Sequence, residues 1–284
     1  MEFDGQLALV TGSTAGIGRE TARLLAAGGA TVIVTGRDEA RGAETVASIE
    51  AEGGQAKFLA ADMADLGSVR ALAEAVGEVD VLVNNAGIFP FAATADQDAE
   101  GFQRLFDVNV RAPFFLTAAL LPGMAARGRG SVVTVSTSAT SFAVPGAAAY
   151  SATKAALESL TRTWAVEYRG TGVRVNAIAP GATVTEGTQA LLPDAVDETG
   201  RKSPLGRTAS AREIAEAIVF LASPRASYVH GELLQADGGR TRTEEHTSEH
   251  QTPTIESSHG PRPPSRRPST QWRARARRGG WRWG

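Results

Sequence analysis

Apolar and β-branched residues recur in short runs between residue 7 and about residue 236, and longer stretches of mixed polarity separate these runs. Continuous apolar runs of this length are typical of strands that are buried on both faces of a sheet. The predicted strands are Leu7–Thr11, Thr31–Thr35, Ala56–Ala60, Val79–Asn84, Ser131–Val135, Val173–Ile178 and Leu233–Ala236.

The stretches between these runs place apolar residues near helical spacing. The predicted helices are Gly16–Gly28, Asp38–Glu52, Leu66–Val76, Asp98–Ala126, Tyr150–Tyr168 and Ala211–Ala222. Strands that alternate with helices in this way indicate a parallel sheet covered by helices on both faces. The sequence therefore predicts an α/β fold: one doubly wound domain, with a seven-stranded parallel sheet, over residues 1–240.

The segment Thr183–Thr208 interrupts this alternation, because it contains two prolines, three glycines and one short apolar patch. A long segment of this kind in a compact domain is either a mobile lid or an ordinary surface loop, and the sequence leaves both open. In a lid, the patch would line the substrate and a loop cation would meet an anion. Within the patch Gln189–Leu192 and just after it, Leu191, Leu192 and Pro193 would form the lining, and Arg201 or Lys202 would meet the anion.

The composition changes abruptly after Gly239, to Thr, Glu, Ser, Pro and Arg. A segment so poor in apolar residues cannot pack a core, so residues 241–284 are predicted to be a disordered basic tail. The stretch Glu244–Glu249 resembles an in-frame translation of sequencing-adapter DNA. We therefore hypothesise a sequencing or reading-frame artefact, with a genuine disordered arm as the alternative; resequencing of the gene decides between them.

The charge of −2 combines a mildly acidic body, at −7 over residues 1–240, with a tail at +5. The body offers no basic surface for nucleic acid, and we expect no nucleic-acid or membrane partner. The chain has no cysteine, and His230 is its one histidine before residue 241. This composition argues against disulfides, Cys-ligated zinc and a Ser-His-Asp triad, and we expect no metal site. The acidic start and the lack of a run of about 18 apolar residues predict a cytoplasmic protein.

A glycine-rich segment follows the first predicted strand and opens the first predicted helix. Glycines there let the backbone turn sharply and approach a pyrophosphate, and the free amides and positive dipole of a helix start attract its charge. A glycine-rich turn also serves simply to join a strand to a helix, so the pattern alone is a modest signal. The candidate cofactor-binding residues are Gly12, Ser13, Thr14, Gly16, Ile17 and Gly18.

Tyr150 and Lys154 stand four residues apart at the start of a long predicted helix, so their side chains lie on one face. A phenol has an unperturbed pKa of about 10, and a nearby ammonium favours the phenolate. The pair is a candidate for proton transfer, although a packed tyrosine beside a solvated lysine gives the same pattern. The preceding strand ends in the hydroxyl residues Ser136, Thr137 and Ser138.

Together these motifs resemble those of the short-chain dehydrogenase/reductase family. The spacing within Thr11–Gly18, the Asn84–Gly87 segment after the fourth strand, Pro180–Thr185 after the sixth and Asp237–Gly239 at the end of the last all have counterparts in that family. The resemblance covers roughly residues 5–240. It implies a Rossmann fold, a bound nicotinamide dinucleotide and hydride transfer to or from a carbonyl carbon.

The resemblance also implies further cofactor contacts at the strand ends. Asp62 follows the third strand, where the family has an aspartate that bonds the adenine, and the segment after the sixth strand contacts the nicotinamide amide and the phosphates. By resemblance, the cofactor-binding residues beyond the glycine segment are Asp62, Met63, Asn85, Ala86, Gly87, Tyr150, Lys154, Pro180, Gly181, Thr183 and Thr185.

In the family, an Asn, a Ser, a Tyr and a Lys carry the chemistry. By resemblance, Tyr150 is the general acid or base, Lys154 lowers the pKa of that phenol and bonds the nicotinamide ribose, and Asn109 holds a water that relays protons. The family's serine usually stands thirteen residues before the tyrosine, and that position is Thr137, with Ser138 one residue later. A threonine hydroxyl can donate the same hydrogen bond, so both residues remain alternatives.

Cofactor preference is expected to be set at the end of the second strand. An acidic residue there would bind the ribose 2′-hydroxyl and repel a 2′-phosphate, but the sequence has Gly36 followed by Arg37. Arg37 can offer a planar, permanently charged fork to a phosphate, which favours NADP(H) over NAD(H). The alternative is that Arg37 is a solvated surface charge and that Asp38 caps the next helix.

The sequence therefore predicts an NADP(H)-dependent oxidoreductase acting on a ketone or secondary alcohol, of the 3-oxoacyl type or another small carbonyl compound. The alternatives are an NAD-linked alcohol dehydrogenase and a non-catalytic dinucleotide-binding regulatory protein. The resemblance also suggests a homo-oligomer, a tetramer or a dimer, built on the long helices Asp98–Ala126 and Tyr150–Tyr168.

Overall fold

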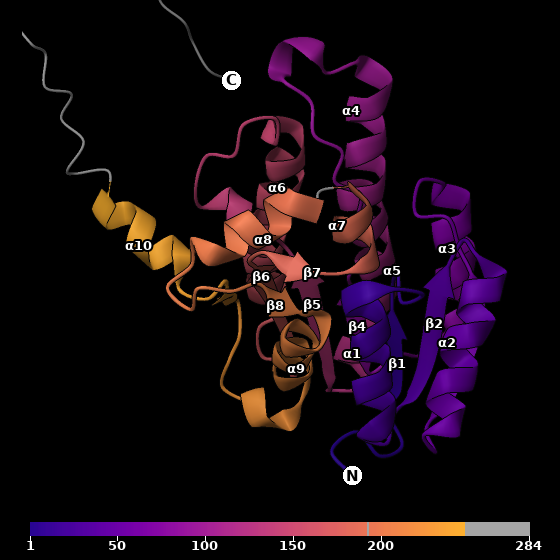
Figure 1. The fold of residues 1–284 in the computed structure, drawn as a ribbon. Coiled ribbons are helices and arrows are strands. Elements are labelled where there is room, and N and C mark those ends of the chain that lie inside the picture. Colours follow the sequence, from indigo (N-terminus) through magenta and orange to yellow (C-terminus); the bar gives the residue numbers. More distant parts are fainter. Residues whose placement is uncertain (192, 248–284) are drawn as a thin grey trace, which may run out of the picture. The chain divides into compact units, whose positions relative to one another are not determined.

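The seven predicted strands form one parallel sheet in the computed structural model, which describes residues 1–191 and 193–247 (Figure 1). These strands are β1 (Leu7–Val10), β2 (Thr31–Gly36), β3 (Gln55–Ala60), β4 (Val81–Asn84), β5 (Gly130–Val135), β6 (Val173–Pro180) and β9 (Leu233–Ala236). Their order is β3-β2-β1-β4-β5-β6-β9, and every neighbouring pair is parallel. The predicted doubly wound α/β fold is confirmed.

Helices cover both faces of this sheet. One face carries α1 (Gly16–Ala27), α2 (Glu39–Ala51) and α9 (Ala211–Ala222), and the other carries α3 (Leu66–Val76), α5 (Ala112–Ala126) and α6 (Ala148–Glu167). Each helix buries a stripe at helical spacing; α9, for example, buries Ile214, Ile218 and Leu221. The two apolar cores therefore lie above and below strands such as β5, whose residues after Gly130 are all buried.

The strand order reverses between β1 and β4, which are neighbours in the sheet although β2 and β3 lie between them in the chain. In sheets of this kind, the reversal leaves a crevice at the carboxyl ends of the strands, where ligands bind. The glycine-rich segment follows β1 and the Asn84–Gly87 segment follows β4, so the topology brings both to this crevice.

The predicted helix Asp98–Ala126 is interrupted. It consists of α4 (Ala99–Phe106), a π-helical turn η2 (Asp107–Arg111) and α5. Pro113, in the first turn of α5, has no N–H to donate to the carbonyl of Asn109, so regular α-helical bonding cannot pass through this point. The wider turn that results contains Asn109, one of the predicted catalytic residues.

The region Ala99–Ala126 is also long and apolar enough to cross a membrane by length and composition alone. Half of its most apolar window is buried inside the protein, however, and α5 packs seven of its residues into the core. The core helix of a globular protein can meet the same criteria of length and composition as a membrane-spanning helix. These criteria are therefore weak evidence that this region crosses a membrane. The cytoplasmic location stays a prediction.

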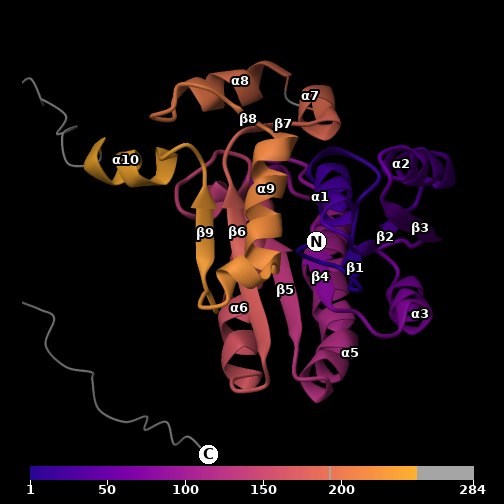
Figure 2. The same ribbon diagram turned by 90° about the horizontal axis from the view of Figure 1, so that it is seen from below.

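The segment predicted to be a lid or a loop contains short regular elements that its sequence did not indicate. It holds β7 (Thr183–Val184), α7 (Glu186–Leu191) and α8 (Pro193–Arg201), and β7 pairs with β8 (Ala209–Ser210). Figure 2 shows α7 and α8 beyond the carboxyl ends of the strands. Leu191, predicted to line the substrate, is 60% exposed, and Leu192 lies outside the described residues.

The chain continues as a helix past the predicted end of the domain. Helix α10 (Arg240–Thr247) includes residues 241–247, which we predicted to be disordered. Its start is held by Asp237, whose carboxylate accepts hydrogen bonds from the backbone N–H and the hydroxyl of Thr241. The rest of the predicted tail, residues 248–284, lies outside the described residues. Short 3₁₀ turns complete the elements: η1 (Thr94–Asp96), η3 (Ser138–Thr140) and η4 (Pro224–Ala226).

Candidate active site

The glycine-rich segment lies against the end of β4, and two of its glycines make this approach possible. Gly12 has a φ of +64°, and a Cβ added to it would lie 2.9 Å from the Cα of Ala86. A Cβ on Gly18 would lie 2.4 Å from both Asn85 Nδ2 and the carbonyl oxygen of Gly12. Since real Cβ atoms do not come so close to other atoms, a side chain at either position would force the two segments apart.

Hydrogen bonds hold the two segments in contact. The Thr11 hydroxyl accepts from the backbone N–H groups of Asn85 and Ala86, each at 3.0 Å. The Asn85 amide donates in return to the carbonyl oxygens of Thr11, at 2.9 Å, and Gly12, at 3.2 Å. Asn85, predicted to bind the cofactor, thus fixes the shape of the glycine segment as well as facing the crevice.

Ser13, another predicted cofactor contact, is placed differently. It is fully buried, its hydroxyl donates to the Val10 carbonyl at 2.7 Å, and it accepts from the Thr35 N–H at 2.9 Å. Its own N–H donates to the Thr35 carbonyl. Ser13 therefore ties the end of β1 to β2 and does not line the crevice, because its polar groups are used within the sheet.

The crevice is a cavity of about 750 Å³, within the range of small-molecule sites. All the predicted site residues except Ser13 and Asn109 line it: Gly12, Thr14, Gly16, Ile17, Gly18, Arg37, Asp62, Met63, Asn85, Ala86, Gly87, Thr137, Ser138, Tyr150, Lys154, Pro180, Gly181, Thr183 and Thr185. The fold thus brings together residues at the ends of six strands, β1 to β6, and residues of the helices α1 and α6, and their individual roles remain predictions.

Tyr150 lies at the end of the cavity away from the glycine segment. Burial raises the pKa of its phenol to about 12, and a hydrogen bond with the Thr137 side chain opposes this rise. The rings of Phe89 and Phe91 each form a T-shaped pair with the ring of Tyr150, with centroids 6.3 and 6.2 Å from its centroid. The phenol is therefore a neutral group at ordinary pH, with apolar rings beside it and one hydroxyl partner.

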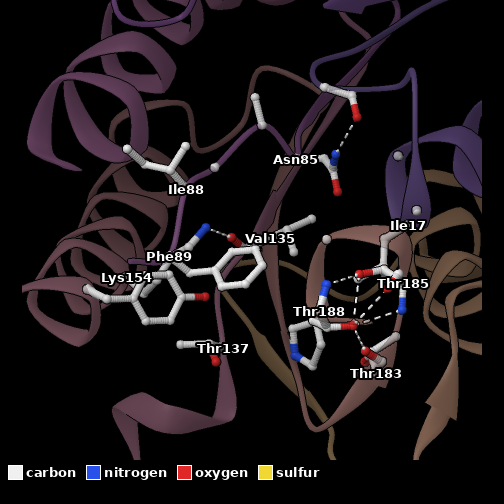
Figure 3. Close-up of a pocket in the computed structure, with 18 of the residues that line it drawn as sticks. Ile17, Asn85, Ile88, Phe89, Val135, Thr137, Lys154, Thr183, Thr185 and Thr188 are labelled. Carbon is white, nitrogen blue, oxygen red and sulfur yellow. Dashed lines mark hydrogen bonds between the residues drawn. The ribbon is translucent and has the colours of Figure 1, made fainter. Parts of the chain in front are cut away.

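Lys154 is also buried, and burial lowers the pKa of its ammonium to about 8. Its Nζ donates to the carbonyl oxygen of Val135 at 2.8 Å (Figure 3). Desolvation is the leading effect on the pKa of Tyr150, and the effect that opposes it comes from Thr137 and not from Lys154, which the resemblance implied. The two groups instead shift in opposite directions for the same reason: each neutral form is favoured by burial.

Asn109 is fully buried behind the cavity. Its amide oxygen accepts from the N–H of Ile88 at 2.9 Å, and its Nδ2 donates to the Ile88 carbonyl at 2.9 Å and to Thr153 Oγ1 at 3.1 Å. Both ends of the amide are thus used in holding the segment after β4 against α6. Asn109 thus fixes the position of the Ile88 backbone, and its role as the holder of a water stays a prediction.

The structure distinguishes the two candidate hydroxyls by their neighbours. The side chain of Thr137 interacts with the Tyr150 phenol and lowers its pKa, whereas Ser138 begins the η3 turn and is buried, although it also lines the cavity. Sequence reasoning missed Glu158, one helical turn after Lys154, whose carboxylate accepts from Ser136 Oγ at 2.6 Å and Thr140 Oγ1 at 2.7 Å. Ser136 and Thr140 lie on either side of Thr137 in the chain, so Glu158 anchors the turn that contains Thr137. The spacing of four residues between Lys154 and Glu158, which places both on one face of the helix, could have indicated this role from the sequence.

The segment after β6 forms the opposite wall. Thr188 donates to the Thr183 carbonyl at 2.8 Å and accepts from the Thr185 N–H at 2.9 Å, a cluster that Figure 3 shows across the pocket from Thr137. A Cβ on Gly16 would lie 3.2 Å from Thr185, so this wall reaches the glycine segment. The predicted anion contacts Arg201 and Lys202 do not line the cavity.

An acidic residue at the start of α7 connects this wall to the far side of the cavity. Glu186 forms an ion pair with Arg19 of α1 at 2.7 Å and a second with Arg41 of α2. All three side chains are a third or more exposed, so each pair contributes little to stability on its own. No pattern in the sequence indicated this network, because the three residues come from separate elements.

Comparisons with known proteins agree with this geometry. Residues 12–241 match the model of a family described as enoyl-(acyl carrier protein) reductase. The chain is 40% identical over 245 residues to cis-4-hydroxycyclohexanecarboxylate dehydrogenase of Sinomonas cyclohexanicum, covering 84% of this chain and 98% of that protein.

A solved structure of a short chain dehydrogenase/reductase family protein is 54% identical, with a TM-score of 0.81, and covers 85% of this chain and all of the other. A gluconate 5-dehydrogenase from Burkholderia cenocepacia J2315, solved with NADP and tartrate, is 34% identical, with a TM-score of 0.78, over 84% of this chain and 96% of that one.

The placement of Thr137 beside Tyr150 makes a paired prediction. Replacing Thr137 with Val removes the hydroxyl and keeps the shape, so we expect kcat for carbonyl reduction to fall by about 10²-fold, as when one donor to a developing oxyanion is lost. Ser138→Ala should change kcat by less than about threefold. Steady-state rates of both variants test this, and an unaltered rate in Thr137→Val together with a large loss in Ser138→Ala would reverse the assignment.

Proposed function

The chain belongs to the short-chain dehydrogenase/reductase family, and we propose that it reduces a ketone to a secondary alcohol with NADPH and also runs the reverse reaction. Family membership makes it an oxidoreductase that acts on CH–OH or C=O groups with a nicotinamide cofactor. The observation that carries the proposal is the Tyr150 phenol: protonated at neutral pH, bonded to Thr137 and facing the cavity into which the glycine segment opens.

The residues around the cavity fit a nicotinamide dinucleotide. The glycine segment places bare backbone and the start of α1 at one side, where a pyrophosphate is stabilised. Gly87 leaves space in front of the lysine, because a Cβ there would lie 3.3 Å from Lys154 Nζ. Arg37 and Asp62 line the cavity at the ends of β2 and β3, beyond the glycine segment. The nicotinamide end would then lie between Lys154 and the segment after β6.

Bound NADPH would supply the hydride, and this chain's own residues supply the proton and the positioning. Tyr150 holds a proton that it can donate to the carbonyl oxygen as that oxygen gains charge. Thr137 can donate a hydrogen bond to the same oxygen. The ammonium of Lys154, one turn along α6, stabilises the negative charge that Tyr150 acquires on giving up its proton. A neutral phenol at rest favours the reductive direction near neutral pH.

The preference for NADP(H) is part of the proposal and rests on Arg37. The alternative was that Arg37 is a solvated surface charge and that Asp38 caps the next helix. Both features are present, because Arg37 is exposed and the Asp38 carboxylate caps α2 by accepting from the Arg41 N–H at 3.1 Å. Arg37 nevertheless lines the cavity, and it makes no ion pair within residues 1–191 and 193–247. The engaged carboxylate of Asp38 is poorly placed to bind a ribose, whereas the guanidinium of Arg37 is available to a phosphate.

We also propose a homo-oligomer formed through α5 and α6. Phe114 and Phe115 of α5 are 39% and 38% exposed, Val166 of α6 is 62% exposed, and Phe114 lies 6.2 Å from Trp164 between ring centroids. The two helices thus present a shared apolar surface, which a second copy of the chain would bury. Light scattering should give the mass of a dimer or tetramer, and a monomer at micromolar concentration contradicts the proposal.

The lowered pKa of Lys154 predicts a pH dependence. The ammonium is charged below a pH of about 8 and neutral above it, so its stabilisation of the ionising phenol is lost as pH rises. We expect kcat for ketone reduction to fall above about pH 8, while Tyr150 stays protonated because its pKa is about 12. Lys154→Met should be slower by about 10²-fold and should lose this titration.

The measurement is the pH–rate profile of both proteins on one ketone, with Tyr150→Phe as the inactive control. A wild-type profile that shows no fall between about pH 7 and 10, or the same fall in Lys154→Met, would falsify the assigned role of the lysine.

A second prediction concerns the cofactor. Replacing Arg37 with Gln should raise KM for NADPH by about tenfold or more, because a charge-assisted bond to the 2′-phosphate is lost, and should leave KM for NADH unchanged. Arg129→Gln is the matched control. Arg129 precedes β5, at the amino ends of the strands and away from the cavity, and its side chain bonds Asp80. Wild-type kcat/KM for NADH equal to or above that for NADPH would contradict the preference.

A further inference from the structure

The end of the cavity beside Tyr150 has apolar walls that the sequence did not predict. Phe89, Phe91 and Val144 line it from the loops after β4 and η3, and Val196 of α8 lines the same cavity. The rings of Phe89 and Phe91 form T-shaped pairs with the phenol ring. A substrate that brings its carbonyl to Tyr150 must therefore place an apolar body among these side chains.

One cation is fixed at this end. The guanidinium carbon of Arg240, the first residue of α10, lies 4.3 Å from the ring centroid of Phe142, and Arg240 is partly buried. Phe142 belongs to the segment between Thr137 and Tyr150, so the contact places Arg240 at the proton-donating end and not at the phosphate end. A cation above an aromatic face is held by the ring. Its five N–H donors also allow it to bind a carboxylate in addition to other partners.

The charges around the cavity favour an anion at this end. Among the described residues that line it, the charged side chains are Arg37, Asp62, Arg104, Lys154 and Arg240. Asp62, the one carboxylate of this set, lies at the end of β3 and accepts from the Ala64 N–H at 2.9 Å. Two of these cations have contacts near Thr137 and Tyr150: Arg240 lies over Phe142, and Lys154 donates to the Val135 carbonyl. Their attraction for an anion is stronger where the dielectric constant is low.

The neighbouring carboxylates are already engaged. Asp237 and Glu213 line a smaller cavity of about 200 Å³ that shares Arg240 with the larger one. Asp237 accepts from the N–H groups of Gly239 and Thr241, and Glu213 is paired with Arg207 at 2.6 Å. These acids hold the local backbone and the start of α9.

We propose that the substrate is an oxo acid with a compact apolar body, and that Arg240 binds its carboxylate while Tyr150 faces its ketone oxygen. This inference rests on the proposed function and adds the substrate class. Hydride and a proton convert the ketone to a secondary alcohol, the nicotinamide is oxidised, and the carboxylate is unchanged. Arg240 is then a specificity-determining residue, because a neutral ketone of the same shape lacks the group that it binds.

The test compares 4-oxocyclohexanecarboxylate with its methyl ester and with cyclohexanone, using NADPH. In the wild-type protein, kcat/KM for the acid should exceed that for the ester by about tenfold or more. Arg240→Gln should lower kcat/KM for the acid by about 10- to 100-fold, mainly through KM, and leave cyclohexanone unchanged. Arg242→Gln, two residues further along α10, exposed and off the cavity wall, should change neither.

Binding without turnover separates this inference from the proposed function. The oxo acid cannot be reduced in the presence of NADP⁺, so calorimetric titration of the acid into the NADP⁺ complex measures recognition alone. We expect binding in the wild type and at least about tenfold weaker binding in Arg240→Gln. Normal turnover of cyclohexanone shows that the variant is folded and that the proposed function holds.

Three results would overturn the inference while leaving the reductase assignment intact. The first is an ester or neutral ketone that is reduced as efficiently as the acid, and the second is an Arg240→Gln variant that keeps its preference for the acid. The third is a loss of that preference in Arg104→Gln and not in Arg240→Gln. A wild-type protein that reduces none of the three ketones, yet binds the acid through Arg240, would instead contradict the proposed reaction and support the recognition site.

Discussion

The site depends on the close approach of the glycine-rich segment to the end of β4. The strand order places β1 beside β4, and the absence of a Cβ at Gly12 and Gly18 lets the two segments touch. Thr11 and Asn85 then lock the contact with hydrogen bonds in both directions. The arrangement of the cavity depends on this contact, because it sets the distance between the glycine-rich segment and the turn after β4, beside which the predicted catalytic side chains lie.

Burial then sets the chemistry. The same removal of water raises the pKa of Tyr150 to about 12 and lowers that of Lys154 to about 8, so a proton donor and a marginally charged cation share one helix. This arrangement has an energetic cost. In the unfolded chain the lysine keeps its proton up to a pH near its ordinary pKa of 10.5. Between about pH 8 and that value, the folded state therefore becomes more stable relative to the unfolded state as pH rises. Below about pH 8 the buried lysine is charged, and this charge destabilises the folded state.

Much of this protein could be predicted from local sequence signals. The seven strands have apolar runs long enough to identify them, and the Tyr150–Lys154 spacing defines a helix face without reference to any other element. Strand-end motifs lie near each other in any parallel sheet, since the carboxyl ends share one edge. For this reason Gly12, Asn85 and Thr137 could be assigned to one site before the fold was known.

The sequence determined the strands and the polar residues at their ends, because each of these is visible in the spacing along a single segment, and the alternation of strands with helices indicated a parallel sheet. The order of the strands in the sheet came from the tertiary structure. Tertiary structure decided the rest. Ser13 and Asn109 carry the expected residue types but point into the sheet and into the support behind the cavity. The apolar walls, Glu158 beneath the Thr137 turn and the placement of Arg240 over Phe142 join residues from separate elements. Such contacts depend on how those elements pack in space, and no pattern within one segment encodes the distance between two.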